Sequence, residues 1–406
     1  MINVSKIRND FPMLKNKMHG RPLIYLDNAA TTFKPKCVID AVVNYYENLG
    51  ANAHRGDYDL SHDVDVAYES VRNKVGKLIN CDAKEVVFTS GASGAINTVA
   101  YGLEEFINEG DEILLSEAEH ASNVLPWFNI AHRKGAVIKY IPLTSEGRIT
   151  IENVKSTITS RTKLISLAHV TNVLGYTLDV KEITKVAHES NIFVVIDGAQ
   201  SVPHMVIDVK DLDCDFLCFS AHKMCGPTGV GVLYGKYELL EKMQPIMLGG
   251  GMNSRFYTCG DYTLHHAPSK FEAGTPHIEG VIGFGAAIDY LESIGMENIH
   301  QYELELKKYA INKMKEIPGV KIYNESNESG VITFNYKDVF AQDIATHFNT
   351  YGIAVRAGQH CAKILTDFLK APATVRASVS FYNTYEEIDF FIEVLKKGDE
   401  YLNAYF

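Results

Sequence analysis

Short apolar segments rich in β-branched and aromatic residues recur along the first part of the chain. They lie at Val86 to Thr89, Glu112 to Leu115, Val137 to Ile141, Leu164 to Leu167, Phe193 to Ile196, Phe216 to Phe219 and Val230 to Leu233. Amphipathic stretches such as VKEITKVAHES (180–190) separate several of them. Apolar strands that alternate with helices are typical of a parallel α/β sheet. The pattern predicts a large α/β domain over residues 22–287, with a mostly parallel central sheet flanked by helices.

The pattern changes in the last third of the chain. It predicts, in order, a helix over 299–317, a strand over 331–336, a helix over 342–352, strands over 353–358 and 374–382, and a closing helix. These elements describe a small α+β domain, to which we assign residues 1–21 and 288–406. The segment 249–271, rich in Gly, Tyr and His, is expected to be a loop near the end of the larger domain.

Composition narrows the class of protein. A chain of 406 residues suggests two domains, and its 46% hydrophobic and 22% charged residues are typical of a globular protein. Acidic residues outnumber basic ones by 50 to 39, which argues against nucleic acid as a partner. The sequence has no run of 18 uncharged apolar residues, so it predicts no membrane span. The seven cysteines are scattered without a CxxC pair, so we expect no metal site and a cytoplasmic protein with reduced thiols.

Two charged residues each follow an apolar strand directly. Asp197 comes after FVVI (193–196), and Lys223 comes shortly after DFLCFS (215–220). The carboxyl ends of parallel strands are where α/β sheets bind ligands. Burial there would lower the pKa of the lysine and leave a neutral amine able to form an imine. Each residue alone has an ordinary interpretation as a cap, a turn or a sheet-edge side chain, but the pair predicts a cofactor site.

A turn rich in Gly and Ser follows another predicted strand. Residues 89–97 (TSGASGAIN) lead into a predicted helix, whose free N–H groups point at the strand end and favour an anion such as phosphate. Such turns are common, so this motif alone is equally consistent with a structural turn. Ser93, Ser220 and His222 could converge on one phosphate. Asp197 would then serve a pyridinium nitrogen.

The order of the motifs resembles a known family. The motifs are YLDNAATTFKP (25–35), NAHRG (52–56), TSGASGAIN (89–97), EHASNVLPW (119–127), HVTNVLG (169–175), VIDGAQSVPH (195–204), FSAHKMCGPTGVGVLYG (219–235), GGGMNSRF (249–256), FEAGTPHIEG (271–280), RAGQHCAK (356–363) and VRASVSFYN (375–383). They resemble the fold-type I pyridoxal 5'-phosphate (PLP) enzymes of the aminotransferase class V family, most closely its group II, SufS-type cysteine desulfurases. The resemblance covers nearly the whole chain.

The resemblance implies roles for the cofactor-binding residues. It implies that Lys223 holds PLP as a Schiff base, that Asp197 holds the ring nitrogen and that His120 stacks on the ring. Gln200 and Asn172 are expected near the ring hydroxyl. The set expected around the phosphate is Ala92, Ser93, Ser220, His222 and, from the neighbouring subunit of a homodimer, Thr275.

Cys361 is the residue that distinguishes among the reactions of this family. It lies in a Gly-containing turn, with Arg356, His360 and Lys363 nearby. Positive neighbours lower the pKa of a thiol and raise the fraction of reactive thiolate. Most other cysteines are expected to be small buried apolar residues.

Four further residues are expected at the substrate. By resemblance, Arg376 would hold the substrate carboxylate, a task that suits a planar guanidinium. Arg356 is expected to face the same pocket. His54 and Arg55 resemble an entrance motif of the active site.

These residues together predict a cysteine desulfurase. With Lys223 as base, the enzyme would release L-alanine from L-cysteine and leave a persulfide on Cys361, for transfer to an acceptor protein of the SufU or SufE type in iron–sulfur cluster assembly. The alternatives are a selenocysteine lyase, another class V enzyme or a non-catalytic scaffold. Cys361 argues against an aminotransferase, and a scaffold has no need of Lys223, Asp197, Cys361 and Arg376 together.

The chain departs from the family pattern at three places. Ala92 and Ser93 stand where two threonines are common, and Gln359 stands where histidine is common. Gln342 stands where the branch that uses a zinc-containing SufU-type acceptor is expected to carry a histidine. His347 is no substitute, because five residues along a helix place it about 140° away from Gln342. The sequence therefore leaves the type of acceptor open.

Overall fold

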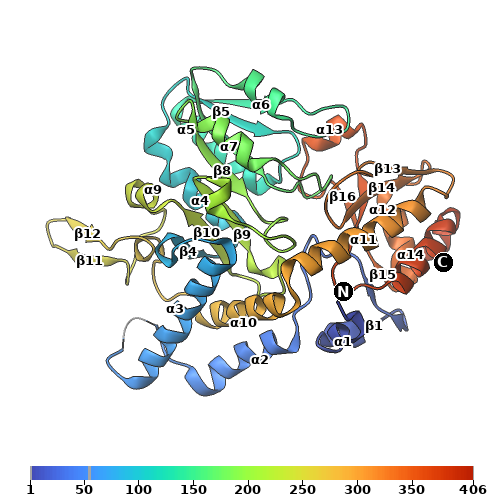
Figure 1. Cartoon of the computed structure of the whole chain (residues 1–406), viewed down its shortest axis with the longest axis horizontal. Helices are drawn as coiled ribbons and strands as arrows, with labels where there is room; N and C mark the ends of the chain where they lie inside the picture. The colour runs from blue at the N-terminus through green and yellow to red at the C-terminus, as the bar shows by residue number, and fades with distance from the viewer. Residues whose placement is uncertain (1, 54–55, 406) are drawn as a thin grey trace.

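A seven-stranded sheet forms the centre of the larger unit in this computed structural model, which describes residues 2–53 and 56–405 (Figure 1). Its strand order is β4 (Val86–Thr89), β10 (Gly231–Gly235), β9 (Phe216–Ser220), β8 (Phe193–Asp197), β7 (Thr162–Ala168), β5 (Glu112–Ser116) and β6 (Val137–Ile141). Strand β10 runs antiparallel to both of its neighbours, and the other pairs are parallel. The predicted mostly parallel sheet is confirmed.

Helices cover both faces of this sheet because its strands are apolar on both sides. Successive side chains of a strand point to opposite faces, so Val194 and Ile196 join one buried cluster and Val195 joins another. The first cluster includes side chains of α3 (Asp59–Ile79), α7 (Val180–His188) and α10 (Ile278–Ile294). The second includes side chains of α4 (Ala92–Gly102) and α5 (Leu125–Lys134). The central strands are therefore buried on both faces.

A second, four-stranded antiparallel sheet forms the smaller unit, at the right of Figure 1. Its strand order is β13 (Val320–Ile322), β14 (Val331–Tyr336), β17 (Thr374–Ser378) and β16 (Arg356–Gly358). Helices α11 (Met296–Met314), α12 (Ala341–Thr350) and α14 (Tyr385–Lys396) share a separate buried cluster with it. This unit has the predicted α+β character.

Three details differ from the sequence-based expectations. The expected strand over 353–358 is two short strands, because β15 (Ile353–Ala354) pairs with β3 (Ile24–Tyr25) while β16 pairs with β17. The strand expected to reach residue 382 ends at Ser378. The segment expected to be a loop contains a hairpin of β11 (Asn253–Phe256) and β12 (Tyr262–Leu264).

The junction between the two units has no linker. Helix α10 runs continuously across residue 287, and Gly295, with φ at 92°, separates it from α11. Phe11 packs in the core of the larger unit, whereas Leu26 packs in that of the smaller one. The domain bounds at residues 22 and 287 stay predictions. Of the helices in the described ranges, none combines the length and apolarity that crossing a bilayer requires.

Candidate active site

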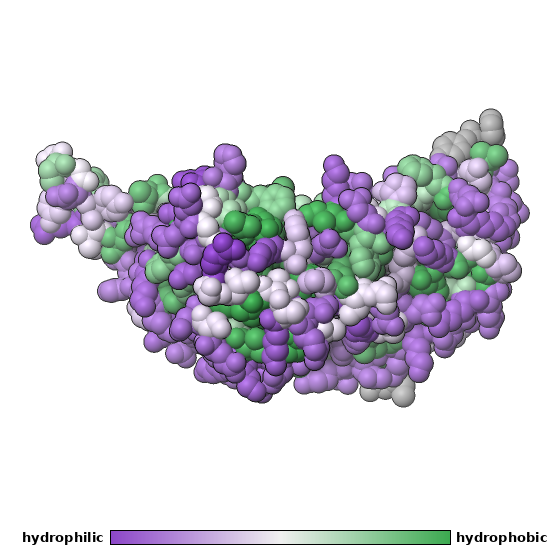
Figure 2. Space-filling view, turned by 90° about the horizontal axis from the view of Figure 1, so that it is seen from above, coloured by the Kyte–Doolittle hydropathy of each residue, from purple (hydrophilic) through white to green (hydrophobic). Residues whose placement is uncertain are grey.

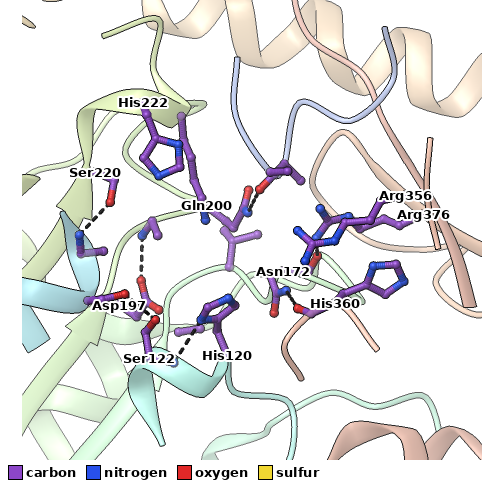
Figure 3. A pocket seen from close by; sticks show the side chains of 18 residues that line it. His120, Ser122, Asn172, Asp197, Gln200, Ser220, His222, Arg356, His360 and Arg376 are labelled. Atoms are coloured by element: carbon purple, nitrogen blue, oxygen red, sulfur yellow. Dashed lines mark hydrogen bonds between the residues drawn. The ribbon is translucent and has the colours of Figure 1, made fainter. Parts of the chain in front are cut away.

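A cavity of about 200 Å³ lies where the ends of the central strands meet the start of α4 and the smaller unit. The predicted residues that line it are Lys223, Asp197, His120, Gln200, Asn172, Ser220, His222, Ala92, Ser93, Arg356 and Arg376. The two arginines and His360 lie on one side, and Asp197 and Ser220 lie on the other, with His120 and Gln200 between them (Figure 3). Segments far apart in the sequence therefore meet at one pocket.

Asp197 and Lys223 come from neighbouring strands of the sheet. Asp197 ends β8, is 5% exposed and accepts the Ala199 N–H at Oδ1 over 2.9 Å. Burial raises the pKa of Asp197, and the charge of Lys223 opposes this. Lys223 ends the short helical turn that follows β9. Removal from water lowers the pKa of Lys223 to about 8, while Asp197 opposes the shift. The amine can therefore lose its proton near neutral pH.

The start of α4 forms the anion-binding end of the cavity. Gly91 precedes the helix with φ at 146°, and Ser220 Oγ accepts the Ala92 N–H over 2.7 Å. A Cβ on Gly231 of the neighbouring strand would lie 2.3 Å from Gly91, so glycine is required for this close approach. Ser93 Oγ lies 2.6 Å from the hydroxyl of Ser122, which also lines the cavity. Hydroxyls and helix N–H groups at this point suit a phosphate.

His120 faces the cavity as a neutral imidazole. Its Nδ1 accepts the Ser122 N–H over 3.1 Å, so the ring proton resides on Nε2. Burial, with the charges of Lys223 and the two arginines, lowers the pKa of His120 to about 4. His222 has a pKa of about 4 for similar reasons, burial first and Lys223 second. Both rings are neutral at physiological pH.

Two guanidinium groups enter the cavity from adjacent strands. Arg356 and Arg376 are directly opposed in the β16–β17 register, and opposed residues project to the same face. Arg376 is 1% exposed, and it donates from Nη1 to the Asn172 carbonyl over 2.9 Å and from Nη2 to Asp27 Oδ1 over 3.3 Å. Its Nε has no partner in the described part of the chain. The group is thus held in place while retaining capacity to bind a carboxylate.

The cysteine turn, which we define as residues 358–362, borders the cavity. His360 and Cys361 both have left-handed backbones, with φ at 52° and 58°. The Cys361 carbonyl accepts the Ala121 N–H over 2.7 Å, and the His360 carbonyl accepts from Asn172 Nδ2 over 2.8 Å. The Cys361 side chain is exposed, and its Sγ lies 3.7 Å from Arg356 Nη2. The strained turn is thus tied to the larger unit at two points.

His360, which precedes Cys361, does not have the positive charge that was expected from the sequence. His360 is 3% exposed, and its Nε2 lies 3.0 Å from the Thr374 carbonyl. Burial, followed by the charges of Arg376 and Arg356, lowers the pKa of His360 to about 3. His360 is therefore neutral, and the expectation that it is a positive neighbour of the thiol is wrong. Arg356 is the cation in contact with the sulfur.

Some of the predicted residues lie outside the cavity. Thr275 accepts from Asn52 Nδ2 over 3.4 Å, away from the cavity lining, so its role toward a neighbouring subunit stays a prediction. His54 and Arg55 lie outside the described residues. Within the described ranges, no group of three or more His, Cys, Asp or Glu side chains could hold a metal ion.

Sequence reasoning missed two contributors to the site. Asp27 holds the guanidinium of Arg376, and Ser122 adds a hydroxyl beside Ser93. Both belong to motifs that supported the family resemblance, YLDNAATT and EHASN. Their position within those motifs was the only signal, because the partner of each is far away in the chain.

The pocket has the features that PLP requires. An amine with a lowered pKa is available for its aldehyde, and a buried carboxylate is available for its ring nitrogen. A neutral histidine lies beside them, and the start of α4 is available for the phosphate. The side-chain oxygen of Asn172, Oδ1, is buried without a partner in the described part of the chain, which leaves an acceptor for a bound group.

Comparison with known proteins agrees with the fold and with the predicted family. The aminotransferase class V family model matches residues 24–391. A probable cysteine desulfurase of Halalkalibacterium halodurans is 46% identical over the full length of both chains. The crystal structure of the cysteine desulfurase CsdA from Escherichia coli is 36% identical with a TM-score of 0.92, covering 98% of this chain and 99% of that one.

A second solved structure has a similar fold and the same sequence identity. The cysteine desulfurase from Thermococcus onnurineus has a TM-score of 0.93 at 36% identity, covering 98% of each chain. Full-length matches of this kind show the family as well as the fold. The chain therefore belongs to the aminotransferase class V family, among its cysteine desulfurases.

Proposed function

We propose that this protein is a PLP-dependent cysteine desulfurase that converts L-cysteine to L-alanine and receives the sulfur as a persulfide on Cys361. One observation carries the proposal. The amine of Lys223, with a pKa of about 8, lines the same cavity as Arg356, whose guanidinium lies 3.7 Å from the exposed thiol of Cys361. A base for carbon chemistry therefore lines the cavity, and a nucleophile for sulfur lies next to one of its lining arginines.

The residues of the larger unit would hold the cofactor. Lys223 would hold its aldehyde carbon, Asp197 its ring nitrogen and the start of α4 its phosphate. When bound, PLP supplies a sink for the electron pair left on the substrate α-carbon. The buried carboxylate of Asp197 would keep the ring nitrogen protonated. The neutral ring of His120 would provide a flat surface beside the cofactor.

Residues of the smaller unit, together with Lys223 of the larger one, would hold the substrate and react with it. Arg376, fixed by Asp27 and the Asn172 carbonyl, would bind the α-carboxylate. Lys223, once free, would remove the α-proton as a neutral amine. Cys361 would then attack the substrate sulfur as a thiolate. A sulfur–sulfur bond forms, the carbon–sulfur bond breaks, and its electron pair goes to the carbon fragment, which gains protons to become alanine.

Alanine and persulfide assays test this proposal. Wild type incubated with PLP and L-cysteine should release alanine and carry one persulfide, which mass spectrometry should locate at Cys361. Cys361→Ala should carry none. Cys259→Ala, which removes another exposed thiol, is the matched control and should behave as wild type. Failure of the wild type to release alanine would refute the proposal.

We further propose that the active enzyme is a homodimer. The hairpin projects at the left of Figure 1, and on the same side of Figure 2 green hydrophobic atoms lie among white and purple ones. Phe256 is 76% exposed, Leu248 59% and Tyr262 55%, which places three large apolar or aromatic side chains in solvent near the hairpin. Exposed apolar surface of this extent favours self-association. Light scattering should give a dimer mass for wild type and a smaller mass for Phe256→Glu.

The destination of the sulfur is the last part of the proposal. A SufU- or SufE-type acceptor would take it for iron–sulfur cluster assembly. His347, the histidine nearest to Gln342 on α12, is 2% exposed and faces the Val394 carbonyl, so it is buried away from a docking protein. A SufE-type acceptor should therefore stimulate turnover more than a zinc-containing one. The cysteines of the described residues are free thiols, which supports a reducing, cytoplasmic compartment.

A further inference from the structure

The turn that follows strand β5 makes three contacts at the active site. His120 faces the cavity, the Ala121 N–H donates to the Cys361 carbonyl over 2.7 Å, and the Ser122 hydroxyl lies 2.6 Å from Ser93 Oγ. The turn therefore touches the ring-binding, sulfur-carrying and phosphate-binding parts of the site. We refer to residues 119–123 as the linking turn.

Glu119 anchors the linking turn from inside the protein. The side chain is 2% exposed, and burial raises its pKa to about 7. Its Oε1 accepts from Ser116 Oγ over 2.6 Å, and its Oε2 accepts from Asn123 Nδ2 over 2.8 Å and from the Ala168 N–H over 2.9 Å. One carboxyl group thus joins the end of β5, the far end of the turn and the end of β7.

Asn123 extends this anchorage. Its Oδ1 accepts from Ser166 Oγ on β7 over 2.5 Å and from Trp127 Nε1 on α5 over 3.2 Å. These residues are all buried, so each hydrogen bond is costly to lose. The buried network fixes where the linking turn presents its three outward contacts.

We propose that Glu119 is a positioning residue for the reaction, which sets the placement of the cofactor-facing His120 and of the cysteine turn relative to each other through the linking turn. This inference rests on the proposed function for its meaning in catalysis. The placement of Cys361 can be measured without any turnover.

Three variants separate the position of Glu119 from its charge. Glu119→Ala removes the acceptor for Asn123 and for the Ala168 N–H. Glu119→Gln preserves the network, because its carbonyl oxygen can accept both bonds while its amide donates to Ser116 Oγ. Glu112→Ala is the control, since Glu112 is a fully buried carboxylate at the opposite end of β5, bonded to Thr159 and Arg161.

The direct readout is the rate of iodoacetamide alkylation at Cys361, measured by peptide mass mapping relative to the exposed Cys37 and Cys259 of the same sample. Glu119→Ala should change this relative rate at least about fivefold, because the turn no longer holds the Cys361 carbonyl. The relative rate should stay within about twofold of wild type in Glu119→Gln and Glu112→Ala. The kcat for alanine release should fall at least about tenfold in Glu119→Ala and recover in Glu119→Gln.

Two results would overturn the proposal. One is a relative alkylation rate that Glu119→Ala leaves unchanged, and the other is a Glu119→Gln variant as altered as Glu119→Ala. If Glu119→Ala fails to fold, Asn123→Ala decides the matter, with a change of at least about threefold expected and no change contradicting the proposal. A wild type that makes no alanine would refute the proposed function, yet the alkylation rates would still test the placement.

Discussion

Two borders of the cavity differ in how they are built. Asp197, Gln200 and Ser220 form what we call the strand-end wall. Each of these residues is 5% exposed or less, and they lie at the ends of central strands of the sheet or just after them. The cysteine turn is held by two hydrogen bonds to its carbonyl groups and leaves the Cys361 thiol exposed. Groups whose protonation must be shifted are removed from water, whereas the thiol that we propose to carry the sulfur stays accessible. Burial therefore separates the two halves of the reaction.

The largest effect is expected from removing the amine at the strand-end wall. Lys223→Ala should lower kcat by at least about 10³-fold, because both the covalent hold on the cofactor and the base are lost. The measurement is alanine release at saturating cysteine. Lys270→Ala is the control, since burial lowers the pKa of Lys270 as it does that of Lys223, but Lys270 donates to the Glu241 carbonyl outside the cavity. An equal fall in kcat for Lys223→Ala and Lys270→Ala would show that the amine of Lys223 has no specific role in the reaction.

A substitution in the cysteine turn should impair the reaction while leaving cofactor binding at the strand-end wall intact. Cys361→Ala should lower alanine release by about 10²-fold or more, since the nucleophile is gone. The visible absorbance and the stoichiometry of bound PLP should match wild type, because no contact of the strand-end wall is removed. Loss of the cofactor from this variant would contradict the separation of the two borders.

A moderate effect is expected from the arginine between the two borders. Arg376→Lys should raise KM for cysteine about tenfold with a smaller change in kcat, because an ammonium group replaces a bidentate contact with a single one. Steady-state kinetics on cysteine measures this. Asp27→Asn, which weakens the hold on Arg376 but leaves the guanidinium, should raise KM less. A KM that is unchanged in Arg376→Lys would remove this residue from substrate binding.

The smallest effect concerns pH. The pKa of Lys223 is lowered to about 8, so its amine is protonated below that pH and neutral above it. The rate at which cofactor-free protein takes up PLP should therefore rise with pH and level off above about 8. Asp197 raises the pKa of Lys223, so Asp197→Asn should move the midpoint to lower pH by about one unit. A midpoint near that of free lysine would mean that the wall does not desolvate the amine.

The sequence predicted the central sheet well because its strands are enclosed on both faces. Such strands read as continuous apolar runs, and this holds for β8, which ends at Asp197, and for β9, which precedes Lys223. The hairpin escaped prediction because it projects from the body and needs no apolar face directed at the core. The break at Val355 escaped because the partner of β15 is β3, near the start of the chain.

Site residues could be predicted where the sequence immediately around them is unusual. Asp197 and Lys223 stand out because a charge directly after an apolar strand is unusual. Asp27 and Glu119 do not stand out, since their contacts are with Arg376, Asn123 and the Ala168 N–H, and no local spacing reveals these pairs. The charge of His360 was wrongly inferred because burial by Thr374 and its neighbours is a property of the folded chain.

Helix α10 limits how this protein can be divided by experimenters. A gene fragment that ends at residue 287 would stop inside the helix and separate Ala287 from Ile288, both fully buried in the core of the larger unit. Such a fragment would lose core side chains and unwind its last turns. Complementation between separately expressed halves should therefore use break points in exposed loops, such as the tip of the hairpin near Gly260, which projects away from both cores.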